Sequence, residues 1–368
     1  MGEESIQKND KVSAHSNHRF VTLDGLRGIA ALAVLAFHIL QRIGSAVPAT
    51  AALAVDFFYV LSGFVIAFAY EDGLRKRRLS FSKFTIVRIV RLYPLLLLGV
   101  AMGSVLALGA ALFQDSITLN EWFSITVLAV LLLPSFVIPE WSTAYPLNGA
   151  AWSLTFEMFM NMVYAVIAPW LSTRVLIGLL VLGAAALFSM SNEYGQILGG
   201  NNQNNFWLGF PRVAYPFLVG VLLFRFRPRF VLPGIYAVLL SAILGIVLMS
   251  GIRPNDFSDF FLVTIVFPVV VYFGAAVQVS NKIGAVMLIL GELSYPVYIL
   301  QNPILRVFLE LEEILDTNGL MSVLMGVVQA AIVIGFSWVM SRHFDLPVRK
   351  WLRARIAAIR PAQAQRPV

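Results

Sequence analysis

The chain has 368 residues, of which 59% are hydrophobic and only 13% are charged, and its formal net charge is +7. Soluble domains contain about 45–50% apolar and about 25% charged residues, so this composition excludes a soluble domain and predicts a multi-spanning membrane protein. The absence of cysteine excludes thiol chemistry, and the clustering of lysine and arginine beside apolar segments favours contact with membrane lipids over nucleic acid.

Eleven apolar runs are candidates for crossing a bilayer, which requires about 20 residues of α-helix. In chain order they cover 28–44, 51–70, 92–113, 122–138, 151–170, 174–190, 208–225, 230–250, 259–279, 286–308 and 319–341. We therefore predict an all-α integral membrane protein, a bundle of about ten transmembrane helices with one further segment that does not cross.

The positive-inside rule predicts the topology. Basic residues lie before 28, between 75 and 91, at 225–229, at 282 and from 342 onward. We expect these segments in the cytoplasm and the acidic segments 115–121 and 310–316 on the opposite side. Four apolar runs lie between 115–121 and Arg225, although an odd number of crossings must separate opposite sides. We expect the run 122–138, which is short and contains Pro134, to be re-entrant or interfacial.

This topology predicts three segments. Residues 1–20 form a polar cytoplasmic tail, residues 21–345 form the transmembrane domain, and residues 346–368 form a basic cytoplasmic tail. Both termini are therefore expected in the cytoplasm, and the chain is expected to cross the membrane ten times.

Two titratable side chains lie within or against the first apolar run, LDGLRGIAALAVLAFHILQRIG. Such residues are costly in a bilayer and are functional-site candidates by default. Eleven positions separate Arg27 from His38, which is three helical turns plus about 20°, so the two side chains share one face about 16 Å apart. We expect Arg27 at the cytoplasmic boundary and His38 about 9 Å below the outer end.

Two carboxylates are predicted at the depth of His38. Asp56 lies about 7–8 Å into the second run and Glu157 about 9 Å into the fifth, both measured from the outer side. A carboxylate at this level can hold an imidazole in one tautomer and stabilise its protonated form. His38, Asp56 and Glu157 are the catalytic candidates. The alternatives are a helix N-cap role for Asp56 and a structural ion pair with an arginine for Glu157.

A basic segment precedes the third apolar run. Arg88 and Arg91 are three positions apart and share a helix face, and Arg27 is expected at the same membrane level. Guanidinium groups bind phosphates bidentately, so these three arginines are candidates to hold a polyanion that carries phosphate or pyrophosphate groups. Topology and lipid contact are the alternative for the rest of the segment. The sequence has no Walker loop and no spaced set of metal ligands, so no metal is expected.

Five segments, in this order, resemble the membrane acyltransferase-3 family. They are LDGLRGIAALAVLAFHI, with an Arg, ten residues and a His; DFFYVLSGFVIA; FTIVRIVRLYP; AWSLTFE; and GELSYPVYIL. The resemblance extends from residue 23 to about residue 350. Two positions depart from the family pattern: Gln301 stands where a His is frequent, and Asp345-Leu346-Pro347 replaces Glu-x-Pro.

The resemblance implies an O-acyltransferase of the bacterial cytoplasmic membrane, with acetyl-coenzyme A as the simplest donor. The implied acceptor is a sugar hydroxyl of a cell-envelope or secreted glycan or of its lipid-linked precursor. His38 would act as general base, or would carry the acyl group as an acyl-imidazole. Trp152 and Tyr295 are candidate substrate contacts, although Trp152 is equally typical of an interfacial belt. A transporter or exporter is the alternative, because polar residues near mid-membrane also mark substrate pathways.

Overall fold

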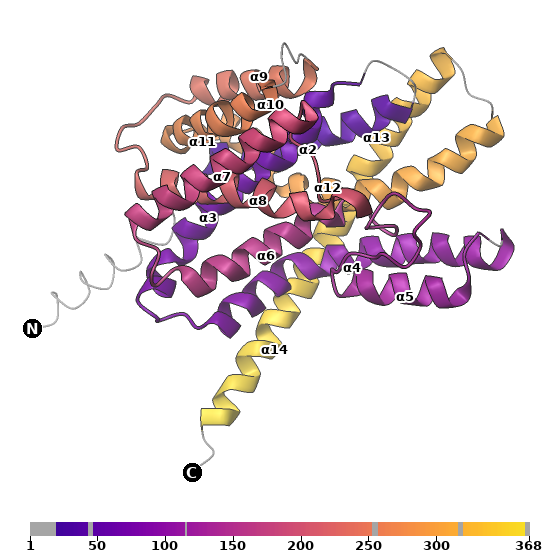
Figure 1. Cartoon of the computed structure of the whole chain (residues 1–368), viewed down its shortest axis with the longest axis horizontal. Helices are drawn as coiled ribbons and strands as arrows, with labels where there is room; N and C mark the ends of the chain where they lie inside the picture. Colours follow the sequence, from indigo (N-terminus) through magenta and orange to yellow (C-terminus); the bar gives the residue numbers. More distant parts are fainter. Residues whose placement is uncertain (1–19, 43–46, 115, 252–256, 316–318, 365–368) are drawn as a thin grey trace, which may run out of the picture.

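The computed structural model describes residues 20–42, 47–114, 116–251, 257–315 and 319–364, which form an all-helical bundle (Figure 1). Nearly all of the predicted N-terminal tail 1–20, residue 115 and residues 316–318 lie outside this described part. The fold class predicted from composition and hydropathy is confirmed.

Eight helical segments in the described part are long and apolar enough to cross a membrane. They are built from α2 (Val21–Arg42), η2 and α3 (Ala49–Leu53, Ala54–Arg75), α4 (Phe81–Phe113), α7 (Thr173–Tyr194), η3 and α8 (Gln203–Leu208, Gly209–Arg225), α10, η4 and α11 (Ser258–Phe261, Leu262–Val266, Phe267–Ala276), α12 (Asn281–Leu315) and α13 (Leu320–Met340). Three apolar helices are shorter: α5 (Leu119–Val130), α6 (Ala151–Ile167) and α9 (Ile235–Met249).

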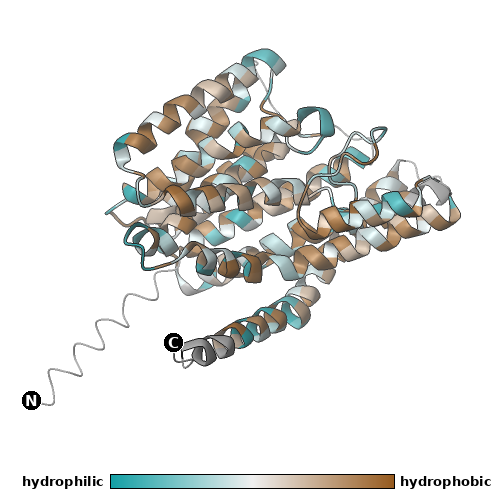
Figure 2. Ribbon diagram, turned by 60° about the horizontal axis from the view of Figure 1, so that its bottom comes forward, coloured by the Kyte–Doolittle hydropathy of each residue, from teal (hydrophilic) through white to brown (hydrophobic). Residues whose placement is uncertain are grey.

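The outer surface of the bundle is apolar, as a lipid-facing surface must be. Leu182, Ile246 and Val327, on α7, α9 and α13, are 69%, 68% and 63% exposed. Figure 2 shows apolar residues along most of the bundle helices. After α13, the short η5 (Ser341–Asp345) leads into α14 (Leu346–Ala364), which extends away from the bundle with polar and apolar residues interspersed (Figures 1 and 2).

The third helix begins earlier than its apolar run. It starts at Phe81 rather than at residue 92, because Ser80 caps it by accepting a hydrogen bond from the Lys83 backbone N–H. Because the first turns of this helix carry basic residues, a hydropathy profile does not detect them. Arg88 and Arg91 therefore lie inside α4 and not in a loop.

The helices α3 and α8 run parallel at very close distance. Asp56 pairs with Arg212 near one end, and Glu71 pairs with Arg225 near the other. Between these pairs, a Cβ atom on Gly63 would lie 1.9 Å from the Phe217 carbonyl oxygen, so only glycine allows this approach. Small residues at such contacts are the usual device for packing membrane helices.

Helix direction places α5 among the segments that do not cross. Because α3 and α8 run in the same direction, the chain must cross the membrane an odd number of times between them. The helices α4, α6 and α7 already provide three crossings. The 12 residues of α5 rise about 18 Å, well short of the roughly 30 Å of a bilayer core. Excluding α5 leaves, in the described part, eight helical segments long enough to cross and the two shorter apolar helices α6 and α9 as candidates for the ten expected crossings.

The segment after α5 enters the bundle without forming a helix. Residues 131–150 pass beside α4, where a Cβ atom on Gly103 would lie 1.9 Å from the Leu147 carbonyl oxygen. Asn148 is 2% exposed, and its side-chain amide donates to the Ile299 carbonyl of α12 at 2.9 Å. Non-helical backbone at membrane depth is tolerated where protein surrounds it. The re-entrant element is therefore α5 together with this segment.

Candidate active site

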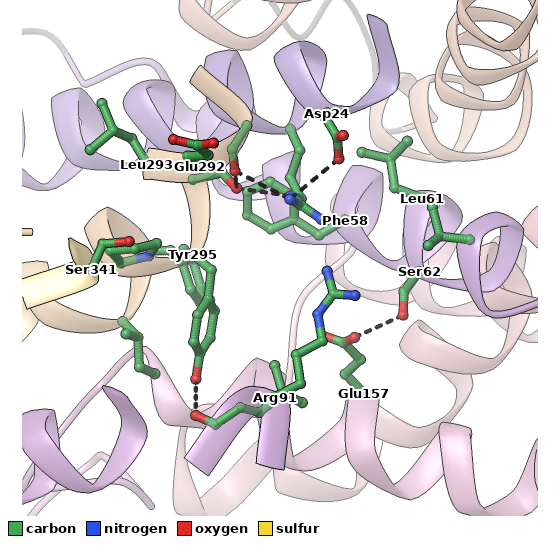
Figure 3. Close-up of a pocket in the computed structure, with 18 of the residues that line it drawn as sticks. Asp24, Phe58, Leu61, Ser62, Arg91, Glu157, Glu292, Leu293, Tyr295 and Ser341 are labelled. Atoms are coloured by element: carbon green, nitrogen blue, oxygen red, sulfur yellow. Dashed lines mark hydrogen bonds and ion pairs between the residues drawn. The ribbon is translucent and has the colours of Figure 1, made fainter. Parts of the chain in front are cut away.

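A pocket of about 640 Å³ lies among α2, α3, α4, α6, α12 and the α13–α14 junction (Figure 3). Its described lining contains five arginines and four carboxylates, which is exceptional for a site within a membrane bundle. They are Arg27, Arg88, Arg91, Arg342, Arg349, Asp24, Glu157, Glu292 and Asp345. The three arginines expected to share a membrane level all line this one pocket.

Arg27 is held against α12 by directed hydrogen bonds. Its Nε donates to the Ser294 hydroxyl at 2.8 Å and its Nη2 donates to the Gly291 carbonyl at 3.2 Å. Asp24, one turn earlier on α2, lies 3.5 Å from Nη2. The helices can approach here because Gly28 and Gly291 carry no side chain at their contact. Arg27 therefore presents a fixed cation to the pocket.

Arg88 forms a buried ion pair with Glu157. Its Nη2 lies 3.0 Å from Glu157 Oε1, which also accepts a hydrogen bond from the Ser62 hydroxyl at 2.8 Å. Only 4% of the Arg88 side chain is exposed, and its Nε has no hydrogen-bond partner among the described residues. The structural pairing anticipated as an alternative for Glu157 is thus present, within the wall of the pocket.

Arg91, unlike Arg88, has no ion-pair partner among the described residues. On the facing wall, Tyr295 donates its hydroxyl to the Leu92 carbonyl and so joins α12 to α4 (Figure 3). At the α13–α14 junction, Arg349 pairs with Asp345 through an Nε–Oδ1 hydrogen bond of 2.8 Å. Tyr295 therefore lines the pocket, and Asp345, the departure from Glu-x-Pro, forms an ion pair there.

His38 lies beyond the pocket and is absent from its described lining. It is half-buried, and its ring meets Phe37 edge-to-face at 5.2 Å. Because α2 and α12 run parallel, with Gly28 against Leu290 and Arg42 donating to the Leu305 carbonyl, His38 stands near the level of Gln301. The lining on α12 ends at Ile299, so His38 lies about half a turn, roughly 3 Å, past this end of the pocket.

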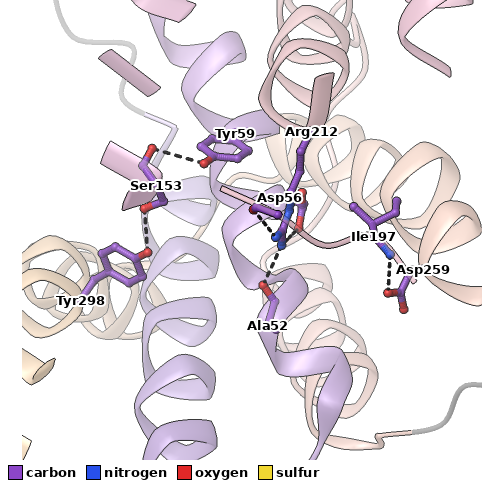
Figure 4. Close-up of polar contacts among 9 residues, drawn as sticks. Ala52, Asp56, Tyr59, Ser153, Ile197, Arg212, Asp259 and Tyr298 are labelled. Carbon is purple, nitrogen blue, oxygen red and sulfur yellow. Dashed lines mark hydrogen bonds and ion pairs between the residues drawn. The ribbon is translucent and has the colours of Figure 1, made fainter. Parts of the chain in front are cut away.

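Asp56 does not pair with His38, contrary to expectation. Both of its oxygens accept hydrogen bonds from Arg212, at 3.0 Å from Nε and 2.8 Å from Nη2 (Figure 4). A fully buried carboxylate needs a cation, and the parallel helix α8 supplies one at the matching turn. Arg212 also lies over the Trp152 ring, 5.0 Å from its centroid. Trp152 thus supports this ion pair and is not part of the described pocket lining.

Glu157 does not share a layer with Asp56 either. The helices α3 and α6 are parallel, and Ser62, six residues beyond Asp56, is the residue that donates to Glu157. Glu157 therefore lies about 9 Å deeper than Asp56. The expected layer fails because α6 begins level with Asp56, six residues before Glu157, so counting residues from its first turn underestimates how far Glu157 lies along the bundle.

Arg212 is a buried charged residue that our sequence analysis missed. It lies within the apolar run 208–225, and the argument applied to Arg27 applies equally to it. A cation and an anion in separate spans, Arg212 and Asp56, are natural partners.

Comparison with known proteins shows the family to which the chain belongs. A sequence model of an acyltransferase domain, Acyl_transf_3, matches residues 20–342. Protein 2 in the picA locus of Rhizobium radiobacter is 37% identical over 156 residues, which are 40% of this chain and 81% of that protein. The acyltransferase MdmB of Streptomyces mycarofaciens is 31% identical over 149 residues, 38% of this chain and 36% of that protein. No solved structure matches. The chain therefore belongs to the membrane acyltransferase-3 family.

Proposed function

We propose that this membrane acyltransferase moves an acyl group, most simply acetyl, from cytoplasmic acyl-coenzyme A to a hydroxyl of a cell-envelope or secreted glycan. The observation that carries the proposal is the pocket in which five arginines meet among the described residues. Arginine forks suit the phosphates of coenzyme A, and each charge-assisted contact can be bidentate. The name of the relative MdmB supports acyl transfer as the reaction class.

The charged and the apolar parts of the pocket lining suit different parts of the donor. The phosphates would exchange their water for Arg27, Arg91 and the arginines of the α13–α14 junction. The uncharged pantetheine arm would then follow the apolar residues of α3 toward the outer end, past Val65 and Leu61. This orientation carries the thioester toward His38.

His38 is the proposed base. One imidazole nitrogen takes the proton of the acceptor hydroxyl as its oxygen attacks the thioester carbonyl. The C–O ester bond forms, the C–S bond breaks, and the leaving thiolate of coenzyme A receives the proton. In the alternative sequence, the imidazole attacks first and passes the acyl group to the hydroxyl in a second step. Both sequences require the thioester carbonyl to lie at the end of the pocket nearest His38.

The transporter alternative is weaker than the enzymatic proposal. The chain belongs to an acyltransferase family over residues 20–342. The described pocket lining on α12 also ends at Ile299 and does not continue across the bundle. Both observations favour acyl transfer.

The test is release of free coenzyme A from acetyl-coenzyme A by purified protein, with and without an envelope glycan fraction. His38→Ala should lower glycan-dependent release by about 10²–10⁴-fold, the usual contribution of a general base. His343→Ala is the matched control, because His343 is exposed and belongs to η5. Wild-type turnover in a correctly folded His38→Ala protein would remove His38 from the reaction.

A further inference from the structure

The outer end of the pocket contains no charged side chain among the described lining residues. On α3 the lining extends from Phe68 near the arginines to Val55 at the outer end, 13 residues or about 20 Å along the helix. The outermost lining residues on α6 and α12 are Ser153, Tyr298 and their neighbours. The pocket is therefore a slot with a charged mouth and an uncharged end.

Four residues that line this end contact one another, and we call them the end wall: Phe58, Tyr59, Ser153 and Tyr298. The hydroxyls of Ser153 and Tyr298 share a hydrogen bond of 2.7 Å, and the Tyr59 hydroxyl donates to the Ser153 carbonyl at 3.3 Å (Figure 4). Phe58 meets the Tyr298 ring edge-to-face at 5.5 Å. Three helices are thus joined across the end of the slot.

The end wall is supported from behind by the buried ion pair. Asp56 lies between Val55 and Phe58 on α3, and Trp152 precedes Ser153 on α6. Arg212 binds Asp56 (Figure 4). It also lies over the Trp152 ring, so it holds the backbone that carries the wall on both helices. Tyr59 is 1% exposed and Tyr298 is 8% exposed, which leaves little space into which these rings could retreat.

We propose that the end wall sets the length of the acyl group that this enzyme accepts, with Phe58 as the specificity-determining residue. The inference rests on the proposed acyl-coenzyme A donor. When the arginines hold the phosphates of the donor, the distance from the arginines to the end wall limits the combined length of the pantetheine arm and the acyl chain. A short acyl group fits before the wall, whereas each further methylene must displace a packed aromatic ring.

The experiment measures binding of coenzyme A and of its acetyl, butyryl and hexanoyl thioesters to purified protein by calorimetry, so that no acceptor is needed. Wild-type affinity should fall as the chain lengthens. In Phe58→Ala the affinity for hexanoyl-coenzyme A should rise at least about tenfold, because each newly buried methylene strengthens binding by about fourfold. Affinity for coenzyme A itself should change little.

Two controls isolate the wall. Phe68→Ala removes an equal ring from the charged end of the same slot, and Tyr298→Phe removes a hydroxyl but keeps the ring. Both should retain the wild-type order of chain lengths. If Phe58→Ala is not monodisperse, Phe58→Leu should shift the order in the same direction by a smaller factor.

The possible failures are distinguishable. Equal wild-type affinity for acetyl and hexanoyl thioesters, or an unchanged order in a folded Phe58 variant, would overturn the end wall as a length determinant. Failure of coenzyme A and all its thioesters to bind to wild-type protein would instead overturn the proposed donor, and with it this inference.

Discussion

Two of the buried ion pairs in the described part of the bundle have different roles, although each joins an arginine to a carboxylate. The Arg88–Glu157 pair faces the pocket, and 22% of the Glu157 side chain is exposed. The Asp56–Arg212 pair lies behind the end wall, where Asp56 is fully buried. A ligand can therefore compete for Arg88, whereas Arg212 is committed to holding helices together.

Loss of the Asp56 carboxylate is expected to destabilise the folded protein rather than to act directly on the acyl-transfer reaction. Removing one partner of a buried pair costs about 3–5 kcal/mol, because the remaining charge stays buried and unpaired. Asp56→Ala should therefore lower the thermal unfolding midpoint strongly, measured in detergent by scanning fluorimetry.

The double variant Asp56→Ala, Arg212→Met removes both charges and provides the control. It should recover much of the lost stability, since replacing both members of a buried pair is often nearly neutral. A folded, thermally wild-type Asp56→Ala protein that has lost acyl transfer would contradict the structural role and restore Asp56 as a catalytic candidate.

At the scale of elements, hydropathy predicted the helices well because lipid leaves the backbone no alternative to internal hydrogen bonds. Each of the eleven apolar runs contains a helix. The hydropathy profile failed in two places. The first turns of α4 are helical but basic, and residues 131–150 are apolar but not helical. Apolar composition indicates depth in the membrane, but it does not indicate whether a segment crosses.

Chemical labelling tests the re-entrant element. In this cysteine-free chain, Ser116→Cys precedes α5 and Glu140→Cys follows it, and both positions are exposed. If α5 does not cross, both cysteines should react with a membrane-impermeant maleimide added to the same side of intact cells. Arg77→Cys and Arg229→Cys should be protected under those conditions and should react after permeabilisation.

Opposite labelling of the two positions that flank α5 would show that α5 crosses the membrane. It would also conflict with the parallel directions of α3 and α8, which depend on contacts at both ends of the pair. Labelling of all four positions from one side would contradict the predicted topology as a whole.

For the molecule as a whole, residue spacing predicted which groups share a helix face but not how far one helix is displaced along another. Arg27, Arg88 and Arg91 line one pocket because all three lie near the same end of their helices. His38, Asp56 and Glu157 do not form one layer, because α6 begins level with Asp56. The axial offset depends on packing contacts such as Gly63 against Phe217, which a single sequence does not reveal.

The central claim is that the arginine pocket binds the acyl donor, and acetyl-coenzyme A binding to purified protein tests it most directly. Arg91→Ala and Arg27→Ala should each weaken binding by about one to two decades, since a charge-assisted contact contributes about 1.5–3 kcal/mol. Arg91 is the sharper test, because its loss leaves no ion-pair partner behind among the described residues. Arg77→Ala, outside the pocket lining, should bind like wild type. Unchanged affinity in both pocket variants would contradict the account and leave the basic residues as determinants of topology alone.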